Sequence, residues 1–197
     1  MTNQRLVLIC GHAACLKTSL SLVVAPRLKI NLVNTYGMGT FDPSSPVKLA
    51  RDRAVRYERL FAIADTYLSK GLSIWVDGNF PRRAWRSKIL DMARYYHIAE
   101  LAVIYCHCSK ALTLKDRFER RRVDPNQPDA NASDMSAYYG SVSQFEPLLD
   151  SEFADIAKWE ILYYDSCCKI LAERSQPTAL GSKIYDQMLA SGFIGPA

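Results

Sequence analysis

The cysteines of this sequence lack the spacing of common metal-binding motifs. The chain has 197 residues and six cysteines, and no two cysteines form a Cys-x-x-Cys pair. We therefore expect no cysteine metal site. Several cysteines, such as Cys10 and Cys106, instead lie inside apolar runs, where a free thiol packs like a small hydrophobic side chain. Without a recognisable secretory leader, this usage predicts a cytoplasmic protein.

Long hydrophobic runs are also missing. No apolar stretch approaches the roughly 18 residues needed to cross a bilayer, so we expect no membrane association. Hydrophobic residues make up 49% of the chain and charged residues 23%, which is the balance of ordinary globular proteins. The length fits one domain, and no linker or repeat divides it, so we predict a single domain over residues 1–197.

The positive charge is modest but locally concentrated. The net charge is +5, which is low for a general nucleic-acid surface. Much of the basic excess lies in two clusters, one of Arg82, Arg83, Arg86 and Lys88 and the other of Lys115, Arg117, Arg120, Arg121 and Arg122. Such clusters favour focused anion binding, and two solvated helix faces are the alternative interpretation.

Short apolar segments alternate with segments of helical periodicity along the whole chain. The apolar runs predict strands near residues 5–10, 29–33, 72–76, 101–106 and 160–164. Between and after them, helices are expected near residues 17–26, 47–70, 81–96, 110–122, 134–149 and 178–190. This order predicts an α/β fold in three layers, with a five-stranded parallel sheet covered by helices on both faces. Ligands of such folds bind at the carboxyl ends of the strands.

A candidate phosphate-binding loop follows the first predicted strand. The stretch Gly11 to Thr18 has the spacing Gly-x4-Gly-Lys-Thr except at Leu16. In the usual chemistry Lys17 reaches the β- and γ-phosphates of ATP, and the Thr18 hydroxyl binds Mg²⁺. We predict that nucleotide is bound by Gly11, His12, Ala13, Ala14, Cys15, Leu16, Lys17, Thr18 and Ser19. An ordinary strand-to-helix turn with a fortuitous Lys-Thr pair is the alternative.

Leu16 is the weak point of this motif. A glycine at this position lets the backbone turn tightly and approach phosphate, whereas a branched side chain costs conformational freedom or space. A degenerate loop that still binds nucleotide is therefore a third interpretation, between a regular phosphate-binding loop and an ordinary strand-to-helix turn.

Three stretches resemble the P-loop small-molecule and polynucleotide kinases, with relatives among chloramphenicol phosphotransferases and zeta-type toxins. They are Cys10 to Ala14 with Lys17 and Thr18, the run 74–80 with the arginines after it, and Arg117, Arg121 and Arg122 with the loop at Asp124. Together they span residues 5 to about 150. The resemblance implies a P-loop NTPase fold with a helical lid over residues 110–150.

The same resemblance assigns roles to further residues. It implies that Asp77 is the Walker-B-like carboxylate near Mg²⁺ or the acceptor, and that the lid arginines close over ATP. Arg117 and Arg121 are then catalytic and Arg122 binds the nucleotide. Helical spacing alone places Arg117 and Arg121 on one face. The alternatives are a strand-end turn residue for Asp77 and a solvated helix for the arginines.

One position departs from the family pattern. Many relatives carry an aspartate just after the second strand, where this chain has Asn34-Thr35-Tyr36-Gly37. Asp42 is the nearest carboxylate downstream, and Asp77 is a substitute for the missing base. Phosphoryl transfer depends mainly on positioning and charge, so the loss of this base does not exclude catalysis.

The sequence therefore predicts an ATP- and Mg²⁺-dependent kinase that transfers the γ-phosphoryl group to a hydroxyl, with a small molecule favoured over a nucleic-acid end as the acceptor. A catalytically weakened nucleotide-binding regulator is the main alternative, because Leu16 and the missing aspartate are compatible with lost chemistry. Polynucleotide binding through the basic clusters is a third hypothesis. Neither the acceptor nor the oligomeric state can be derived from the residues.

Overall fold

The structure is a computed structural model that describes residues 4–34, 46–123, 134–173 and 177–195. The side chains of residues 46–51, 121–123 and 173 fall outside this description. The described residues contain one six-stranded sheet with the order β2-β3-β1-β4-β5-β6. The strands are β1 (Arg5–Gly11), β2 (Asn31–Asn34), β3 (Ile74–Asp77), β4 (Glu100–His107), β5 (Trp159–Asp165) and β6 (Ile170–Glu173). The first five are mutually parallel, as predicted.

The sixth strand corrects the expectation of a five-stranded, all-parallel sheet. β6 pairs with β5 in antiparallel orientation, with Asp165 opposite Ile170. Only the turn 166–169 separates the two strands, and so short a connection can join antiparallel strands but not parallel ones. The strand was missed because it is short and lies at the sheet edge, where Ile170 is 58% exposed, so it lacks the continuous apolar run of the buried strands.

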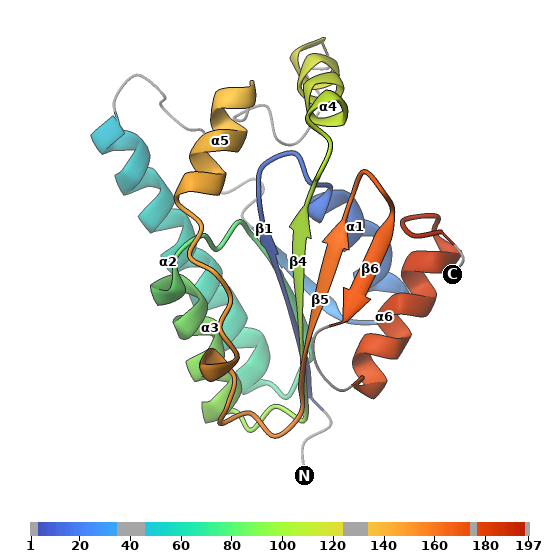
Figure 1. The fold of residues 1–197 in the computed structure, drawn as a ribbon. Helices are drawn as coiled ribbons and strands as arrows, with labels where there is room; N and C mark the ends of the chain where they lie inside the picture. Colours follow the sequence, from blue (N-terminus) through green and yellow to red (C-terminus); the bar gives the residue numbers. More distant parts are fainter. Residues whose placement is uncertain (1–3, 35–45, 124–133, 174–176, 196–197) are drawn as a thin grey trace.

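Helices cover both faces of the sheet, as Figure 1 shows. α2 and α3 lie on one face and α1 and α6 on the other, while α4 and α5 stand beyond the carboxyl ends of the strands. The helices are α1 (Lys17–Arg27), α2 (Pro46–Ser69), α3 (Arg83–Tyr95), α4 (Ala111–Val123), α5 (Met135–Ser143) and α6 (Ala179–Ala190). The three-layer architecture is therefore confirmed.

The strand β1 is buried on both faces, which explains its unbroken apolar sequence. Leu6 and Leu8 belong to the core beneath α2 and α3, whereas Val7 and Ile9 belong to the core beneath α1 and α6. This alternation is the two-residue period of a strand. Because β1 lies at the centre of the sheet, the loop that follows it opens at the middle of the carboxyl edge.

The predicted helix 134–149 is shorter than expected. α5 ends at Ser143, and the chain then runs without regular structure to a 3-10 helix at Asp150–Glu152. Pro147 disfavours helical backbone at the residue before it. Instead, the Glu146 amide donates to the Pro81 carbonyl at 2.7 Å, so this segment is fixed against the start of α3.

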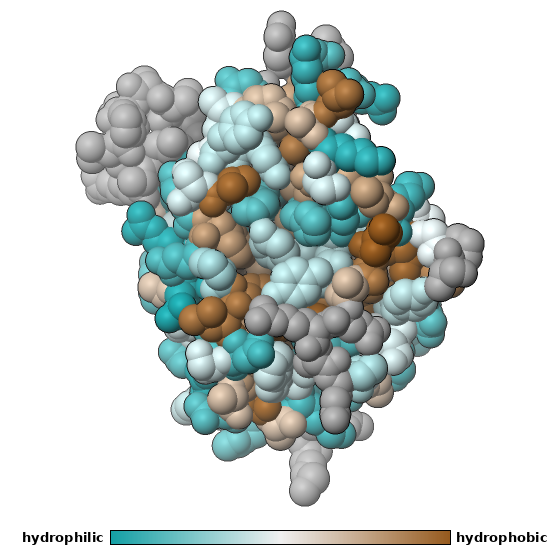
Figure 2. All heavy atoms as spheres, in the orientation of Figure 1, coloured by the Kyte–Doolittle hydropathy of each residue, from teal (hydrophilic) through white to brown (hydrophobic). Residues whose placement is uncertain are grey.

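None of the helices within the described residues is both long and apolar enough to cross a membrane. The face of the molecule in Figure 2 shows hydrophilic and hydrophobic residues interspersed.

Candidate phosphate-binding site

The loop between β1 and α1 begins at a position that only glycine can occupy. Gly11 has φ +123°, and a β-carbon there would lie 2.1 Å from the carbonyl oxygen of Cys106 on β4. A side chain at Gly11 would thus combine a left-handed backbone with a collision against backbone. The loop is also tied to both neighbouring strands' ends, since Gly11 N–H donates to the Asn79 carbonyl and His12 N–H to the Cys106 carbonyl.

Two further loop residues adopt left-handed backbone although neither is glycine. Ala14 has φ 60° and Leu16 has φ 62°. A left-handed conformation costs about 1–2 kcal/mol for a residue with a β-carbon. Alternating left- and right-handed residues turn successive backbone N–H groups into one concavity, which binds anions. Leu16 therefore takes the turn that the missing glycine would take, at an energetic cost.

No capping side chain and no acidic side chain of α1 itself takes the place of an anion at its first turn. Leu16 is the N-cap residue and makes no side-chain capping hydrogen bond, and no acidic residue stands in the first turn. The first N–H groups of a helix lack intrahelical acceptors, and the helix dipole adds partial positive charge there. This end of α1 is therefore suited to a phosphate group.

Lys17 directs its charge into the loop. Its side chain is buried, with the residue 8% exposed, and Nζ donates to the His12 carbonyl. A carbonyl oxygen is dipolar but carries no formal charge, so this contact solvates the ammonium group without neutralising it. A buried cation solvated in this way remains available to a phosphate anion.

Asp77 and Thr18 lie where the prediction placed them. Asp77 is the last residue of β3 and is 3% exposed. In the pairing of β3 with β1 it lies opposite Ile9, two residues before Gly11. Thr18 is half-buried in the first turn of α1, and Ser19 beside it is exposed. Both predicted Mg²⁺ ligands are therefore on the segments that border the loop.

The charges of Lys17 and Asp77 act on the same buried thiol. Burial raises the pKa of Cys106 well above its ordinary value, while Lys17 lowers that pKa and Asp77 raises it. Cys106 is fully buried at the end of β4. The charges of Lys17 and Asp77 therefore both act on the carboxyl end of β4.

Aromatic side chains from β4, from α5 and from the segment after α5 enclose His12. The rings of Tyr105, Tyr138 and Phe145 contact the imidazole edge-on at centroid distances of 5.5, 5.6 and 5.3 Å. The Tyr105 hydroxyl and His12 Nε2 are 2.6 Å apart. Burial, and then the charges of Lys17 and His107, lower the pKa of His12 from 6.5 to about 4. The imidazole is therefore neutral at neutral pH.

The helix α5 also makes a direct contact with the loop backbone. Ala13 N–H donates to the Ser141 hydroxyl at 3.2 Å, and that hydroxyl donates to the Tyr138 carbonyl. One N–H group of the loop is therefore already hydrogen-bonded to a serine hydroxyl. These contacts were not predicted, because α5 lies more than a hundred residues from the loop and serine and tyrosine carry no motif.

Arg117 is brought to the loop, but in this structure it supports the backbone. Its Nη1 donates to the Ala14 carbonyl at 3.0 Å and to the Ser166 hydroxyl at 2.8 Å, and Nη2 donates to the Ser166 carbonyl at 2.8 Å. The guanidinium therefore joins the left-handed Ala14 to the turn after β5.

Some predicted residues lie outside the described part of the chain. Arg121 and Arg122 belong to α4, but their side chains are not among those described. Residues 35–45, which include Asp42, are likewise outside it. The roles predicted for all of these residues stay predictions.

The first basic cluster does not form the anion site that its charge suggested. Arg86 is completely buried and makes a bidentate contact with Glu152, Nε to Oε2 and Nη2 to Oε1, both at 3.0 Å. Its other N–H groups donate to the carbonyls of Phe80, Pro81 and Pro147. Lys88 pairs with Glu58 at the surface. Arg82, Arg83 and Lys88 are exposed, and the Lys88 charge is already paired.

The fold is shared with solved structures that include kinases. A kinase candidate from Chloroflexus aurantiacus superposes with a TM-score of 0.65 at 21% identity, over 98% of this chain and 99% of that one. Kti12 of Chaetomium thermophilum, solved with ADP-AlF3, gives 0.55 at 15% identity over 96% and 100% of the two chains. A fungal RNA kinase gives 0.51 at 13% identity over 97% and 86%.

Neither a model of a protein family nor a curated protein sequence matches the chain. At the identities of the solved structures, the likeness establishes the fold alone. The chain therefore has the fold of P-loop kinases, and the case for its activity depends on its own loop.

Proposed function

We propose that this protein is a kinase that binds ATP on the loop 11–18 and transfers its γ-phosphoryl group to a hydroxyl group. The observation that carries the proposal is the buried Lys17 ammonium, which contacts the backbone of a loop with left-handed residues at Ala14 and Leu16. Such backbone gathers N–H groups into an anion-binding concavity. A fixed positive charge and a row of N–H donors stabilise the charge of a transferring phosphoryl group.

The reaction has a simple balance. The acceptor oxygen forms a bond to the γ-phosphorus while the bond between that phosphorus and the ADP oxygen breaks, and the acceptor proton leaves. Asp77 is our candidate for the group that orients the hydroxyl and receives the proton, because it is a buried carboxylate at the carboxyl end of β3. Arg121, and Arg122 beside it, are the candidates for closing over the phosphates from α4.

The residues that border the loop suit Mg²⁺. This ion prefers oxygen ligands and commonly takes one or two from protein and the rest from phosphate and water. The Thr18 hydroxyl and the Asp77 carboxylate supply oxygen ligands from two adjoining elements. When bound, the ion would offset phosphate charge, while Lys17 and the loop hold the nucleotide in place.

A small-molecule acceptor in the cytoplasm is the finer part of the proposal. The exposed residues Asn79, Arg82 and Arg83 follow β3 directly, at the sheet edge where ligands of this fold class bind. The exposed Arg82, together with Arg83, whose Nε is 3.6 Å from Glu152, favours an acceptor that carries negative charge or several hydroxyls.

The test measures ADP formation by the purified protein with Mg²⁺, in the presence of sugars, sugar acids, nucleosides and RNA ends. We expect Mg²⁺-dependent ADP formation that one acceptor class stimulates, and loss of that activity in Lys17→Ala. A protein that binds Mg·ATP but forms no ADP with any acceptor would contradict a kinase.

That second outcome would support a nucleotide-binding regulator. The specific observation in its favour is the Ser141 hydroxyl on the Ala13 N–H, together with the strained residues Ala14 and Leu16. In a regulator, nucleotide would displace α5 from the loop and change the surface that α5 presents. Limited proteolysis of α5 with and without ATP distinguishes this role, because only a regulator needs the change without turnover.

A further inference from the structure

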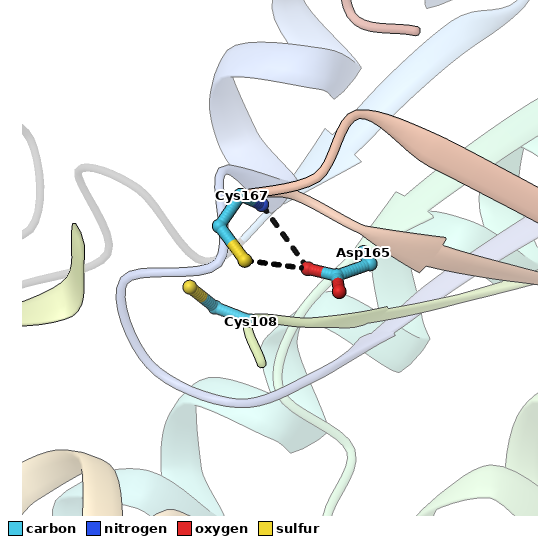
Figure 3. Close-up of side chains that lie close together, drawn as sticks. All are labelled: Cys108, Asp165 and Cys167. Carbon is cyan, nitrogen blue, oxygen red and sulfur yellow. Dashed lines mark hydrogen bonds between the residues drawn. The ribbon is translucent and has the colours of Figure 1, made fainter. Parts of the chain in front are cut away.

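Two thiols and a carboxylate, none of them from the phosphate-binding loop, meet at the ends of β4 and β5 beside Ser166, which Arg117 joins to that loop. Cys108 directly follows β4, Asp165 is the last residue of β5, and Cys167 lies in the turn to β6. β4 and β5 pair with His107 opposite Asp165, so the three side chains extend from adjacent strand ends. Figure 3 shows the two sulfur atoms and one carboxylate oxygen directed toward one another.

The distances between the three groups suit a metal ion. One ligand atom of each residue lies within 4.8 Å of the other two, and Cys167 Sγ is 3.0 Å from Asp165 Oδ1. In a tetrahedral zinc site with bonds near 2.3 Å, neighbouring sulfur ligands are about 3.8 Å apart. A zinc ion would therefore need only small side-chain movements, mainly to separate the Cys167 thiol from the carboxylate it now contacts.

The backbone already holds the cluster in shape. Asp165 Oδ1 accepts hydrogen bonds from the N–H groups of Cys167, at 3.1 Å, and Ser109, at 3.3 Å. The N–H and hydroxyl of Ser166 both donate to the His107 carbonyl at 2.9 Å, which fixes the turn against β4. Such outer contacts orient metal ligands.

Access to the cluster is possible from one side. Cys108 is buried with 4% exposure, whereas Asp165 and Cys167 are half-buried. An ion can therefore enter past the outer two groups and meet the inner thiol.

We propose that Cys108, Asp165 and Cys167 form a binding site for Zn²⁺, with the fourth position open to water. Two thiolates and a carboxylate suit zinc, whereas Mg²⁺ requires oxygen ligands. Binding releases the two thiol protons to solvent and changes no oxidation state. The proposed zinc ligands therefore share no residue and no ligand chemistry with the proposed Mg²⁺ ligands, Thr18 and Asp77.

Cys168 provides a matched control. Its sulfur lies 3.8 Å from that of Cys167 and 3.6 Å from the Ser109 hydroxyl, yet it is outside the set of three mutually close groups. Cys168→Ser removes a neighbouring thiol of equal chemistry without removing a proposed ligand.

The experiment titrates the full-length protein with Co²⁺, without nucleotide, in a phosphine reductant that keeps all thiols reduced. Cobalt substitutes for zinc and reports thiolate ligands through a sulfur-to-metal charge-transfer band. We expect this band to saturate at one equivalent of Co²⁺, to disappear when Zn²⁺ is added, and to persist in Cys168→Ser. The affinity of Cys108→Ser and Cys167→Ser should fall by more than about tenfold, since even outer-shell changes cost that much.

Asp165→Asn keeps an oxygen acceptor for the backbone N–H groups, so it tests the carboxylate in a variant that should fold, as circular dichroism will verify. We expect weaker Co²⁺ binding with the thiolate band preserved. The site is contradicted if the wild type gives no thiolate band, if Cys108→Ser and Cys167→Ser retain full affinity, or if Cys168→Ser loses as much as they do. A disulfide between Cys108 and Cys167, found by mass spectrometry under the reducing conditions, would also overturn it.

Discussion

Two buried cations, Lys17 and Arg86, lie in opposite chemical settings. Arg86 is fully buried and matched by the buried carboxylate of Glu152, with carbonyl oxygens for its remaining N–H groups. Lys17 is 8% exposed and contacts the neutral carbonyl of His12. A charge whose bonds are complete within the protein stabilises one conformation, whereas a charge solvated by a neutral carbonyl can gain energy from an incoming anion. The comparison indicates a structural role for Arg86 and supports the proposal that Lys17 binds a phosphate group.

The largest effect that follows is on folding. Arg86→Ala would remove the bidentate partner of the buried Glu152 and leave it the half-exposed Arg83, whose Nε is 3.6 Å away. We therefore expect the free energy of unfolding to fall by about 3–5 kcal/mol. Urea denaturation measures this. Lys88→Ala is the control, because it removes a basic residue of the same helix whose pair with Glu58 is exposed and worth at most about 1 kcal/mol. Equal losses in both variants would remove the distinction between the two basic residues.

A smaller effect concerns pH at the enclosed histidine. The pKa of His12 is 6.5 when unperturbed and about 4 in the fold, so between these values the unfolded chain binds a proton that the folded protein excludes. The free energy of unfolding should therefore be unaffected by His12 above pH 6.5 and should decrease as the pH drops toward 4. We expect a loss of about 1–2 kcal/mol, a conservative fraction of what the full shift implies.

Urea midpoints of the wild type and His12→Gln across this pH range test the assignment. The difference between the two proteins should narrow toward pH 4, since glutamine has no proton to gain. Parallel pH profiles would show that His12 is not the group responsible.

The smallest expected change in stability is at Leu16. Leu16→Gly relieves a left-handed residue, worth about 1–2 kcal/mol, but a glycine loses about 0.5–1 kcal/mol of chain entropy on folding, so stability should change little. Mg·ATP affinity should rise, because the backbone gains room where phosphate approaches. Leu16→Ala keeps the strain and shortens the side chain. Calorimetry on both variants separates backbone strain from bulk, and weaker binding in Leu16→Gly with intact folding would show that the loop needs leucine.

The sequence predicted the parts of the molecule that depend on local pattern. The buried strands were found because both of their faces are apolar, as in β1, and the loop was found because glycine and lysine spacing encodes its backbone. β6 was missed because an edge strand needs no apolar run, and the end of α5 because Pro147 acts on the residue before it.

The long-range partners of the site were not predictable in this way. The roles of Arg86 and Ser141 are set by Glu152 and by the loop amide of Ala13, which are distant in sequence and brought close only by folding. For the same reason, the expectation against a cysteine metal site considered only sequential spacing, whereas Cys108 and Cys167 approach one another across paired strands.

The most direct test of the central claim is isothermal titration calorimetry of Mg·ATP into the wild type, Lys17→Ala and Lys88→Ala. We predict that the wild type and Lys88→Ala bind with the same affinity and that Lys17→Ala binds about 10–100-fold more weakly, the equivalent of one lost charge-assisted contact of about 1.5–3 kcal/mol. Equal affinity in all three proteins would contradict the account and leave Lys17 as an ordinary residue at the start of a helix.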